Sequence, residues 1–327
     1  MNKKWDVVAL GEILIDFAPG GKSGAGMPLY ECNPGGAPAN VLAAVTRQGG
    51  RAAFIGKVGS DSFGAFLETT LRECDIDTSG LCVDEDTRTT LAFVSLDETG
   101  NRSFSFFRNP GADYMLSKED VNTDLIRDAA TFHFGSLSLT HEPARSATRY
   151  AVETAVQAGA LISYDPNLRL ALWPTADAAR EQILAYLHYA DIVKISDEEF
   201  EFLTGSPDYE TGAAAFMEQY GLSCLFVTLG PKGAFYRCNG FGGKLPTYDV
   251  KVVDTTGSGD SFMGAVLGKL SKRSAGLNAL GEAEIREIVD FANASGSMAA
   301  RAKGAIPAIP TTEQVLECMR TVPLLNQ

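Results

Sequence analysis

The chain has 327 residues, of which 45% are hydrophobic and 21% are charged, and its formal net charge at pH 7 is -13. This balance is typical of a folded globular protein with a sizeable core, and it excludes a disordered chain. The excess of acidic side chains repels nucleic acid and anionic lipid at long range, so we expect neither as a partner. A small anionic ligand is still allowed, because basic groups and backbone amides can override the mean field inside a cleft.

The first residues and the cysteines of the chain indicate a cytoplasmic protein. Asp6 and Glu12 interrupt the first apolar residues, so no signal peptide is expected, and no apolar stretch reaches the roughly 20 residues that a membrane helix needs. The cysteines form no C-x-x-C pair and have no histidine at zinc-like spacing, so we expect buried, reduced thiols. They are Cys32, Cys74, Cys82, Cys224, Cys238 and Cys318.

Short apolar segments, rich in β-branched residues, alternate with longer segments of helical period along most of the chain. This rhythm predicts βαβ units, and hence an α/β fold in which helices cover both faces of a central, mostly parallel sheet. No internal repeat or linker divides the chain, so we expect a single domain over residues 1–327. The predicted strands lie at 5–11, 52–59, 130–136, 160–167, 190–196 and 224–230.

Two regions break this rhythm. Residues 12–34 are rich in glycine, and residues 87–113 begin with two alternating strands about the turn 98–101, which is a hairpin signal. We expect these two regions to form a small β-sheet that stands off the main sheet and acts as a lid. An exposed apolar face of the lid, with Phe104 and Phe106 on one side of the alternation, would pair with a second lid, so we expect a homodimer.

Two common phosphate-binding motifs are absent. Residues 20–24 (GGKSG) contain the Gly-Lys-Ser of a P-loop, but the position of the motif's first glycine is occupied by Asp16. In residues 257–264 (GSGDSFMG) the third glycine lies two residues too far along for a dinucleotide-binding fingerprint. Neither a P-loop nor a Rossmann nucleotide site is therefore expected.

The stretch VDTTGSGDSFMGAVLG, at 253–268, places a glycine-rich turn directly before a segment of helical composition. Gly257 and Gly259 can adopt positive φ and leave backbone N–H groups exposed at a helix N-terminus, which binds anions. Asp260 would repel a phosphate there unless it accepts a proton from an attacking hydroxyl, as the general base of phosphoryl transfer does. The alternative is an ordinary helix cap.

A second glycine pair, Gly35 and Gly36, precedes another predicted helix, whose first turn carries Asn40. The amide of Asn40 can both donate to and accept from a polyol, and the carboxylate of Asp16, which we expect at a strand end, can accept from two adjacent hydroxyls. These features suit a sugar, although a plain strand-to-helix turn would explain each of them alone.

Polar residues also follow the predicted strand at 160–167. In a parallel sheet the ligand crevice lies at the carboxyl ends of the strands, where we expect Asp16, Asp165 and the loop before Asp260. Arg169 offers a planar fork suited to a phosphate, and a structural salt bridge is the alternative for this cluster.

Two later strand ends suit a nucleotide and its metal ion. The acidic cluster Asp197, Glu198 and Glu199 can hold Mg²⁺ through water, or it can simply complement a helix dipole. The turn that begins at Thr228 can face a nucleotide.

Together these stretches resemble the ribokinase-type (PfkB) family of carbohydrate kinases, and within it the fructokinases, nearly from end to end. Two long motifs occur in the family's order and separation, NPGGAPANVLAAV at 33–45 and VDTTGSGDSFMGA at 253–265. The resemblance implies the ribokinase-like α/β/α fold with a β-sheet lid. Other matching stretches are GEILIDF, RAAFIGKVGSDSFG, FFRNPGADYML, DPNLRLALWP, KISDEEFEFLTG, VTLGPKGAF and KGAIPAIPT.

The resemblance also implies roles for individual residues. Asp260 would be the catalytic base, with Arg169 near the phosphates. The anion hole for the transferring phosphoryl group would be made by Gly257, Ser258 and Gly259. The sugar would be held by Asp16, Gly35, Gly36, Asn40 and Arg108. The nucleotide would contact Ser196, Thr228, Gly230, Gly233, Gly257, Gly259 and Asn293.

The implied cofactors are ATP and Mg²⁺, with K⁺ as a further candidate. Glu199 would bind Mg²⁺ through water in the family's N-x-x-E motif, which begins with Ser196 here and leaves the role of the asparagine open. Ala308 stands where some relatives have a serine at the monovalent-cation site. The positions that match oxygen donors of that site are Asp254, Thr256, Ala299, Ala302 and Gly304.

The expected activity is ATP-dependent phosphorylation of D-fructose at its 6-hydroxyl, which gives fructose 6-phosphate and ADP. Asp260, with an unperturbed pKa near ~3.9, would be ionised at neutral pH. One alternative is a kinase for a sugar acid such as 2-keto-3-deoxygluconate, which would need an added cation or tyrosine near Arg108, where the sequence has Phe106 and Phe107. Another is a catalytically idle relative that senses sugar or serves in assembly, which the intact Asp260 and glycine turns disfavour.

Overall fold

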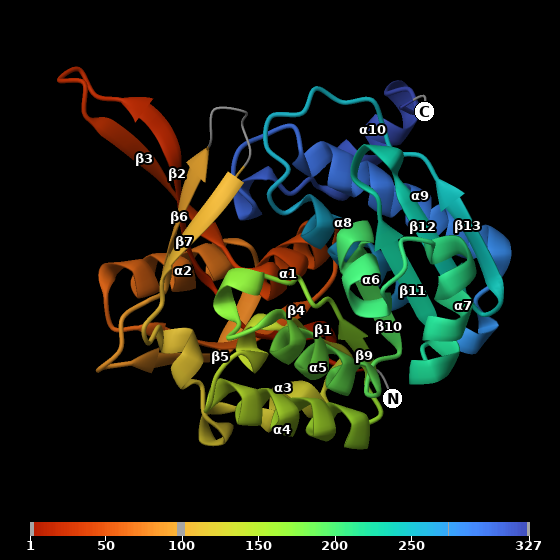
Figure 1. Ribbon diagram of the computed structural model, residues 1–327, viewed down its shortest axis with the longest axis horizontal. Coiled ribbons are helices and arrows are strands. Elements are labelled where there is room, and N and C mark those ends of the chain that lie inside the picture. Colours follow the sequence, from red (N-terminus) through yellow and green to blue (C-terminus); the bar gives the residue numbers. More distant parts are fainter. Residues whose placement is uncertain (1–2, 97–101, 274, 326–327) are drawn as a thin grey trace.

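The computed structural model describes residues 3–96, 102–273 and 275–325 of the chain. They form three layers, with helices on both faces of a large sheet, and a second, smaller sheet stands beside this body (Figure 1). The expected α/β class is therefore confirmed, including the small second sheet. In the described residues no helix is long and apolar enough to cross a membrane.

The strands divide between the two sheets. The large sheet contains β1 (Trp5–Leu10), β4 (Ala52–Gly59), β5 (Ile76–Asp84), β8 (Ala129–Phe134), β9 (Leu161–Tyr164), β10 (Ile192–Ser196), β11 (Cys224–Thr228), β12 (Ala234–Cys238) and β13 (Phe241–Leu245). The small sheet contains β2 (Leu14–Lys22), β3 (Pro28–Gly35), β6 (Leu91–Leu96) and β7 (Arg102–Phe107).

The helices also divide into two sets, one for each face of the large sheet. One face carries α1 (Ala37–Arg47), α2 (Ser62–Glu73), α8 (Ser258–Leu270), α9 (Glu282–Ala299) and α10 (Thr312–Thr321). The other face carries α3 (Thr123–Arg127), α4 (Ala144–Gln157), α5 (Ala176–Leu187), α6 (Asp197–Thr204) and α7 (Tyr209–Tyr220).

The large sheet has the strand order β13-β12-β11-β10-β9-β8-β1-β4-β5. Neighbours from β11 to β5 are parallel, and only β12 and β13 join in antiparallel fashion among the described strands of this sheet. Parallel neighbours bring all their carboxyl ends to one edge, which is where a ligand crevice forms in sheets of this kind.

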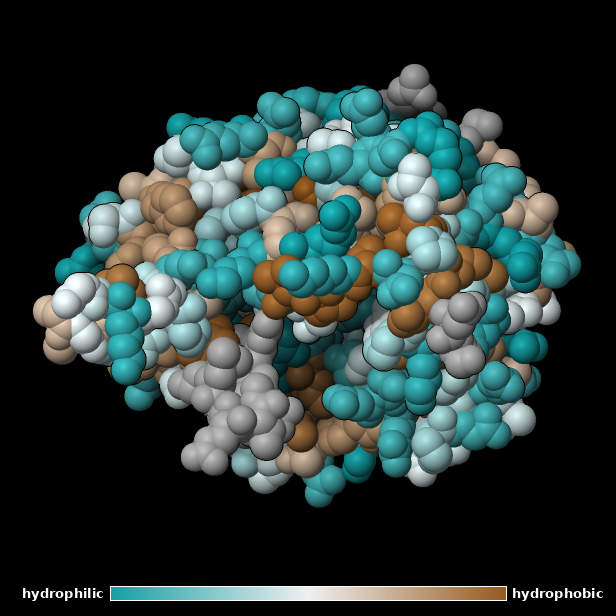
Figure 2. Space-filling view, turned by 90° about the horizontal axis from the view of Figure 1, so that it is seen from above, coloured by the Kyte–Doolittle hydropathy of each residue, from teal (hydrophilic) through white to brown (hydrophobic). Residues whose placement is uncertain are grey.

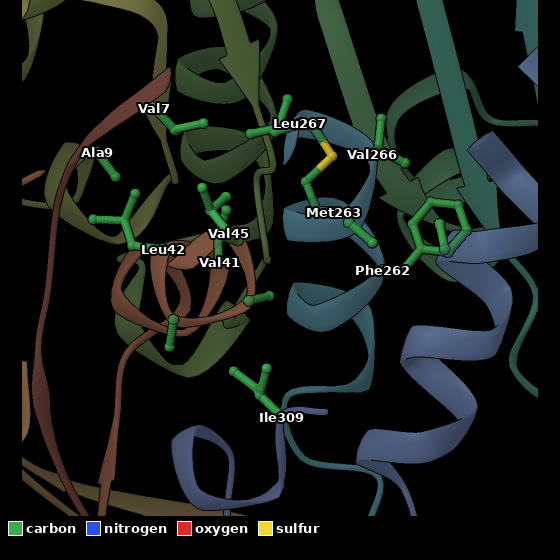
Figure 3. Packing of buried hydrophobic residues seen from close by; sticks show 14 of the residues in the cluster. Val7, Ala9, Val41, Leu42, Val45, Phe262, Met263, Val266, Leu267 and Ile309 are labelled. Carbon is green, nitrogen blue, oxygen red and sulfur yellow. The ribbon is translucent and has the colours of Figure 1, made fainter. Parts of the chain in front are cut away.

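Alternate residues of the strands belong to separate halves of the core. In β1, Val7 and Ala9 pack on the face that α1 and α8 cover, whereas Val8 and Leu10 pack on the opposite face. Strands that are apolar on both faces are typical of a parallel sheet enclosed by helices. Figure 3 shows side chains of α1 and α8 meeting on the first of these faces.

The two helices that begin at the glycine-rich turns lie against each other. Gly264 of α8 permits this close approach, because a Cβ atom there would collide with Ala44 and with the carbonyl oxygen of Val41 in α1. The contact holds the first turn of α1 beside the first turn of α8, although 220 residues of sequence separate Asn40 from Asp260.

The small sheet, which we call the lid, has the order β3-β2-β6-β7. It forms from two antiparallel pairs, β2 with β3 and β6 with β7, joined by parallel pairing of β2 with β6. The expected turn at 98–101 and the side chain of Phe104 lie outside the described residues. Asp16 lies inside β2 of the lid, so the expectation that it ends a strand of the main sheet is wrong.

The faces of the lid differ from the sequence-based expectation. Asp16, Ala92 and Phe106 lie opposite one another in register, and therefore share one face of the lid. Phe106 lines the cleft below that face, so it does not belong to the outer apolar face as expected. The outer face carries Phe93 and Phe107, whose rings contact each other edge to face, and 65% of the surface of Phe107 is exposed.

The expectation of six buried, reduced thiols is also wrong. Cys224 and Cys238 lie opposite each other on β11 and β12 and form a disulfide. Cys32 is exposed and Cys82 is partly buried, so only Cys74 and Cys318 fit the expectation.

Candidate functional site

A cleft lies between the lid and the carboxyl edge of the large sheet. It holds about 330 Å³, within the range of small-molecule sites. Figure 2 looks onto this side of the molecule and shows the surface hollowed between the lid and the main body. The lining comes from the lid, from the first turns of α1 and α8, and from the ends of β9 and β10.

The first turn of α1 contributes Gly36 and Asn40. Gly36 has φ 116° and a Cβ atom there would collide with the carbonyl oxygen of Glu12, so the turn requires glycine. The side-chain amide of Asn40 donates to Oδ2 of Asp260 at 2.7 Å. Its Oδ1 is buried and has no hydrogen-bond partner in the described part of the chain, which leaves an acceptor for a ligand hydroxyl.

The first turn of α8 contributes the glycine-rich turn. Gly257 precedes the helix with φ 77°, and a Cβ atom there would lie 2.9 Å from the Cβ of Ala305, so a side chain would not fit. The N–H of Ser258 donates to the carbonyl oxygen of Thr255 at 3.2 Å. The first N–H groups of a helix have no acceptor within the helix, so those of Gly259 and Asp260 are the donors that the turn offers to an anion. The buried hydroxyl of Ser258 has no partner among the described residues.

Gly259 is not the positive-φ residue that the sequence suggests, since it lies inside α8 and is absent from the residues with positive φ that the structure describes. Glycine has a different effect at this position: a Cβ atom there would lie 2.9 Å from Nζ of Lys194, so its absence lets the ammonium group approach the turn closely. The strand before this turn is also not parallel, because β13 is an antiparallel edge strand. The loop before Asp260 therefore reaches the cleft from the edge of the sheet and not from the carboxyl end of a parallel strand.

Asp260 is 8% exposed at the centre of the cleft. Burial raises its pKa from 3.8 to about 6, and the nearby Asp165 adds to the rise, whereas Lys194, the hydrogen bond from Asn40 and Arg169 lower it. The group is therefore ionised at pH 7, as expected from sequence, but it is a stronger base than an unperturbed aspartate.

Two more carboxyl groups line the cleft from the lid side. Burial raises the pKa of Asp16 to about 6, and Gly35 makes room for its carboxylate, because a Cβ atom on Gly35 would collide with Oδ2. Gly35 itself is not part of the lining. Glu12, which the sequence analysis did not single out, accepts from the N–H of Ala37 at 2.9 Å, and burial raises its pKa to about 7.

Lys194 of β10 is the second residue that the sequence analysis missed. Its ammonium group lies 3.0 Å from Oδ2 of Asp165, and the side chain is only 7% exposed. The signal was a charge inside an apolar strand of a parallel sheet, which is rare unless the charge is paired or functional. Arg169 lines the same cleft and donates to the carbonyl oxygen of Leu168 at 3.1 Å.

Arg108 does not line the cleft. It is 6% exposed, forms a buried ion pair with Asp113, and lies over the ring of Tyr114 with its guanidinium carbon 3.6 Å from the ring centre. The expected direct role at the sugar is therefore not supported, and a tyrosine does lie near Arg108 after all. Arg108 acts on the cleft through its charge, which lowers the pKa of Glu12 against the larger effect of burial.

A second cavity, of about 550 Å³, adjoins the first. Thr255 and Gly259 line both, so the two cavities meet at the turn before α8. The second cavity also contains four of the residues that the resemblance assigns to a nucleotide. They are Thr228, Gly230, Gly233 and Asn293.

These nucleotide-side residues have identifiable local roles. Gly230 and Gly233 have φ of 56° and 86°, as the tight turn after β11 requires. Asn293 of α9 donates to the carbonyl oxygens of Leu245 and Pro246, so it holds the loop that forms one wall of the cavity.

Ser196 and Glu199 form a capping box at the start of α6. The hydroxyl of Ser196 accepts from the N–H of Glu199 at 3.1 Å, and Oε2 of Glu199 accepts from the N–H of Ser196 at 2.7 Å. Oε1 of Glu199 accepts from the N–H of Leu168. Each carboxylate oxygen keeps a further lone pair, so these bonds do not prevent Glu199 from holding a metal-bound water.

The residues assigned to a monovalent cation lie on the loop before α8, at the end of α9 and on the loop that follows α9. Asp254 accepts from the N–H of Thr256 at 2.7 Å and from the N–H of Gly304 at 3.2 Å. The N–H of Val253 donates to the carbonyl oxygen of Ala300 at 2.8 Å. The described residues contain no group of three or more histidine, cysteine, aspartate or glutamate side chains placed to hold a metal ion.

The fold and the two adjoining cavities fit one class of protein, a phosphotransferase that acts on the hydroxyl group of a small molecule. A family model described as the pfkB family of carbohydrate kinases matches residues 4–312, and the chain belongs to this family. The resemblance that the motifs suggested is therefore confirmed.

Individual relatives agree with this assignment. The chain is 47% identical to fructokinase-1 of rice (Oryza sativa subsp. japonica) over 96% of this chain and 98% of that one. The structure of fructokinase from Xylella fastidiosa with bound ATP matches with a TM-score of 0.87 and 33% identity, over 96% of this chain and 98% of that one. A double mutant of fructokinase from Vibrio cholerae O395, with fructose, ADP and a potassium ion bound, matches with a TM-score of 0.86 and 34% identity over 97% and 99% of the chains.

Proposed function

We propose that this protein is an ATP-dependent fructokinase, which converts D-fructose and ATP to fructose 6-phosphate and ADP. The observation that carries the proposal is the meeting of the two cavities at Gly259, directly beside Asp260. A sugar hydroxyl in the first cavity and a terminal phosphate entering from the second would both reach this point. The choice of fructose and ATP as the two substrates rests on the family and on the fructokinases among the relatives of this chain.

The sugar would lie under the lid. Asp16 and the free Oδ1 of Asn40 would accept from its hydroxyl groups, and Gly36 allows the backbone to approach closely. Three carboxyl groups line this cavity, from Glu12, Asp16 and Asp260. They favour a neutral ketose over a sugar acid such as 2-keto-3-deoxygluconate, because a substrate carboxylate would meet a repulsive field there.

Asp260 would act as the general base. Its carboxylate accepts the proton of the 6-hydroxyl while the oxygen bonds to the γ-phosphorus and the bond from phosphorus to the ADP oxygen breaks. The N–H groups of the α8 turn, with Arg169, would stabilise the charge on the phosphoryl oxygens. Closure of the lid would exclude water and so suppress hydrolysis of ATP.

ATP would occupy the second cavity, with its phosphates directed to the α8 turn. Mg²⁺ would neutralise phosphate charge there, held by the nucleotide and, through water, by Glu199. For K⁺, the oxygen donors would be Asp254, Thr256, Ala299, Ala302 and Gly304, on the loops that abut the turn.

Substrate assays test the function directly. The purified protein would be given ATP, Mg²⁺ and, separately, fructose, ribose, adenosine, glucose or 2-keto-3-deoxygluconate, and ADP release would be followed in a coupled assay. We expect fructose to give the highest kcat/KM, with phosphate found on O6 by NMR. A preference for the sugar acid would favour the alternative kinase, and no turnover with any of them would favour an idle sensor.

The lid supports a homodimer as the working assembly. Its outer face exposes Tyr30 and Phe107 by 49% and 65% of their surface, and the ring of Phe93 contacts both, so these apolar groups suit burial against a second lid. We expect sedimentation velocity to show a dimer, and Phe107→Lys to dissociate it. Leu316→Lys, on exposed α10, is the control that should stay dimeric; a wild-type monomer at all concentrations would contradict the proposal.

A further inference from the structure

Lys194 occupies the point where the two cavities meet. Its Nζ lies 2.9 Å from the position that a Cβ atom would take on Gly259, and Gly259 lines both cavities. Lys194 also lines the first cavity and a neighbouring hollow beside Ser196 and Glu199. A phosphoryl group passing from one cavity to the other at Gly259 would therefore pass beside this ammonium group.

The hydrogen bonds of Lys194 leave room for a ligand. In the described part of the chain the acceptor of its ammonium group is Asp165, at 3.0 Å. An ammonium group carries three N–H donors, so two are left for a substrate. The side chain is 7% exposed, and a buried cation with unused donors is costly unless a partner arrives.

The charges around Lys194 keep it protonated. Asp165, Glu199 and Asp260 raise its pKa against the effect of burial. His133 lies behind it, hydrogen-bonded to Ser163, and burial together with the charge of Lys194 lowers the pKa of His133 to about 3, so the imidazole is neutral. Lys194 is therefore a fixed positive charge.

The first cavity needs such a charge. Its lining contains three carboxyl groups, from Glu12, Asp16 and Asp260, against two cations, Arg169 and Lys194. A phosphoryl group that arrives next to an ionised Asp260 is repelled, and this repulsion grows as the oxygens of the transition state gather charge. The ammonium group of Lys194 lies close to the glycine turn, so it offsets the repulsion between Asp260 and the phosphoryl group at the point of transfer.

We propose that Lys194 is a catalytic residue whose ammonium group donates to a non-bridging oxygen of the phosphoryl group during its transfer from the nucleotide to the sugar hydroxyl. The proposal rests on the proposed kinase function. In this step the sugar oxygen bonds to phosphorus, the bond to the ADP oxygen breaks, and Asp260 takes the hydroxyl proton. Lys194 keeps its own proton throughout.

The competing explanation is structural: Lys194 would serve only to neutralise the buried Asp165. Lys194→Met removes the charge at similar length, and Lys194→Met with Asp165→Asn removes both charges of the pair and leaves no unpaired carboxylate. If Lys194 contacts the phosphoryl group, both variants lose about 10²- to 10³-fold in kcat, as enzymes do when one oxyanion donor is removed. Their KM for the sugar should change less than about threefold.

Recovery of the double variant to within about threefold of wild-type kcat would overturn the proposal, because a structural role predicts that recovery. A binding measurement also distinguishes the catalytic role of Lys194 from the structural role. Affinity for ADP with aluminium fluoride and sugar, which imitates the transferring phosphoryl group, should fall at least thirtyfold in both variants, while affinity for ADP alone stays unchanged. Equal affinity of wild type and double variant for the fluoride complex would also overturn it.

The same design separates this proposal from the proposed function. Wild-type turnover is measured first on the set of sugars, and a substrate other than fructose would refute the fructokinase assignment alone. The Lys194 series is then measured with the accepted sugar, so its result still decides the role of Lys194.

Discussion

Asp260→Asn should slow the enzyme and stabilise the fold at the same time. The variant removes the proposed base, so kcat should fall by about 10²- to 10⁴-fold, which corresponds to about 3 to 5 kcal/mol of barrier. The sugar affinity should change little, because the side-chain carbonyl oxygen of the substituted residue can still accept the hydrogen bond from the amide of Asn40. The fall in rate is measured by ADP release at saturating ATP and fructose.

The stabilisation follows from the pKa of Asp260. Burial raises this pKa from 3.8 to about 6, so the ionised carboxylate costs the folded state about 3 kcal/mol at pH 7, at 1.36 kcal/mol per pKa unit. The cost is fully present above pH about 6 and disappears as the pH falls towards 3.8, where the group is protonated in both states. A neutral asparagine avoids it, which for a chain of 327 residues raises Tm by about 4 °C.

Calorimetry at pH 7.5 and at pH 4 tests this prediction. The variant should be more stable at pH 7.5, and the difference should shrink at pH 4. Asp191→Asn is the control. Asp191 is a partly buried carboxylate that lies directly before β10, outside the cleft, and accepts a hydrogen bond from the N–H of Ile162. The kcat of this variant should match that of the wild type. A lower Tm for Asp260→Asn at pH 7.5, or a near-normal kcat, would refute the reasoning.

Three further predictions follow from the geometry of the cleft. Gly35→Ala should raise the KM for fructose at least tenfold with little change in kcat, because its Cβ atom would displace the carboxylate of Asp16. Gly268→Ala is the control: no atom lies within 4 Å of the new Cβ, so neither KM nor kcat should change. The kcat of the wild type should fall about tenfold per pH unit below pH about 6, as Asp260 becomes protonated, and a flat profile from pH 5 to 8 would exclude it as the base. Activation by K⁺ over Na⁺ should be lost in Asp254→Asn, and a wild type indifferent to K⁺ would remove the cation site from the proposal.

Much of the fold could be predicted from the sequence, because it depends on local patterns. Alternation of apolar strands with amphipathic segments requires a parallel sheet between two helix layers, and the structure has that arrangement. The glycine-rich turns could likewise be placed before helices, and the positions of Asn40 and Asp260 just after those turns identify them as candidate site residues. The family motifs then set the class of reaction.

Other features depended on contacts between distant segments. Period-two alternation shows which residues of a strand lie on the same face as Asp16 or Phe106. It does not show which face of the lid meets the cleft. Arg108 lies in a strong motif, yet its pairing with Asp113 holds it outside the lining.

Local sequence patterns are enough to predict the layered fold, the two glycine turns and the acid that follows one of them. The chemistry of that acid depends instead on how distant segments pack together. The pKa of Asp260 depends on burial, on Asp165 at the end of β9 and on Lys194 of β10, and no local pattern shows that these two residues lie beside it. The physical reason is that charge and desolvation act through space, so residues 29 positions apart in the chain form one ion pair beside a helix that neither belongs to.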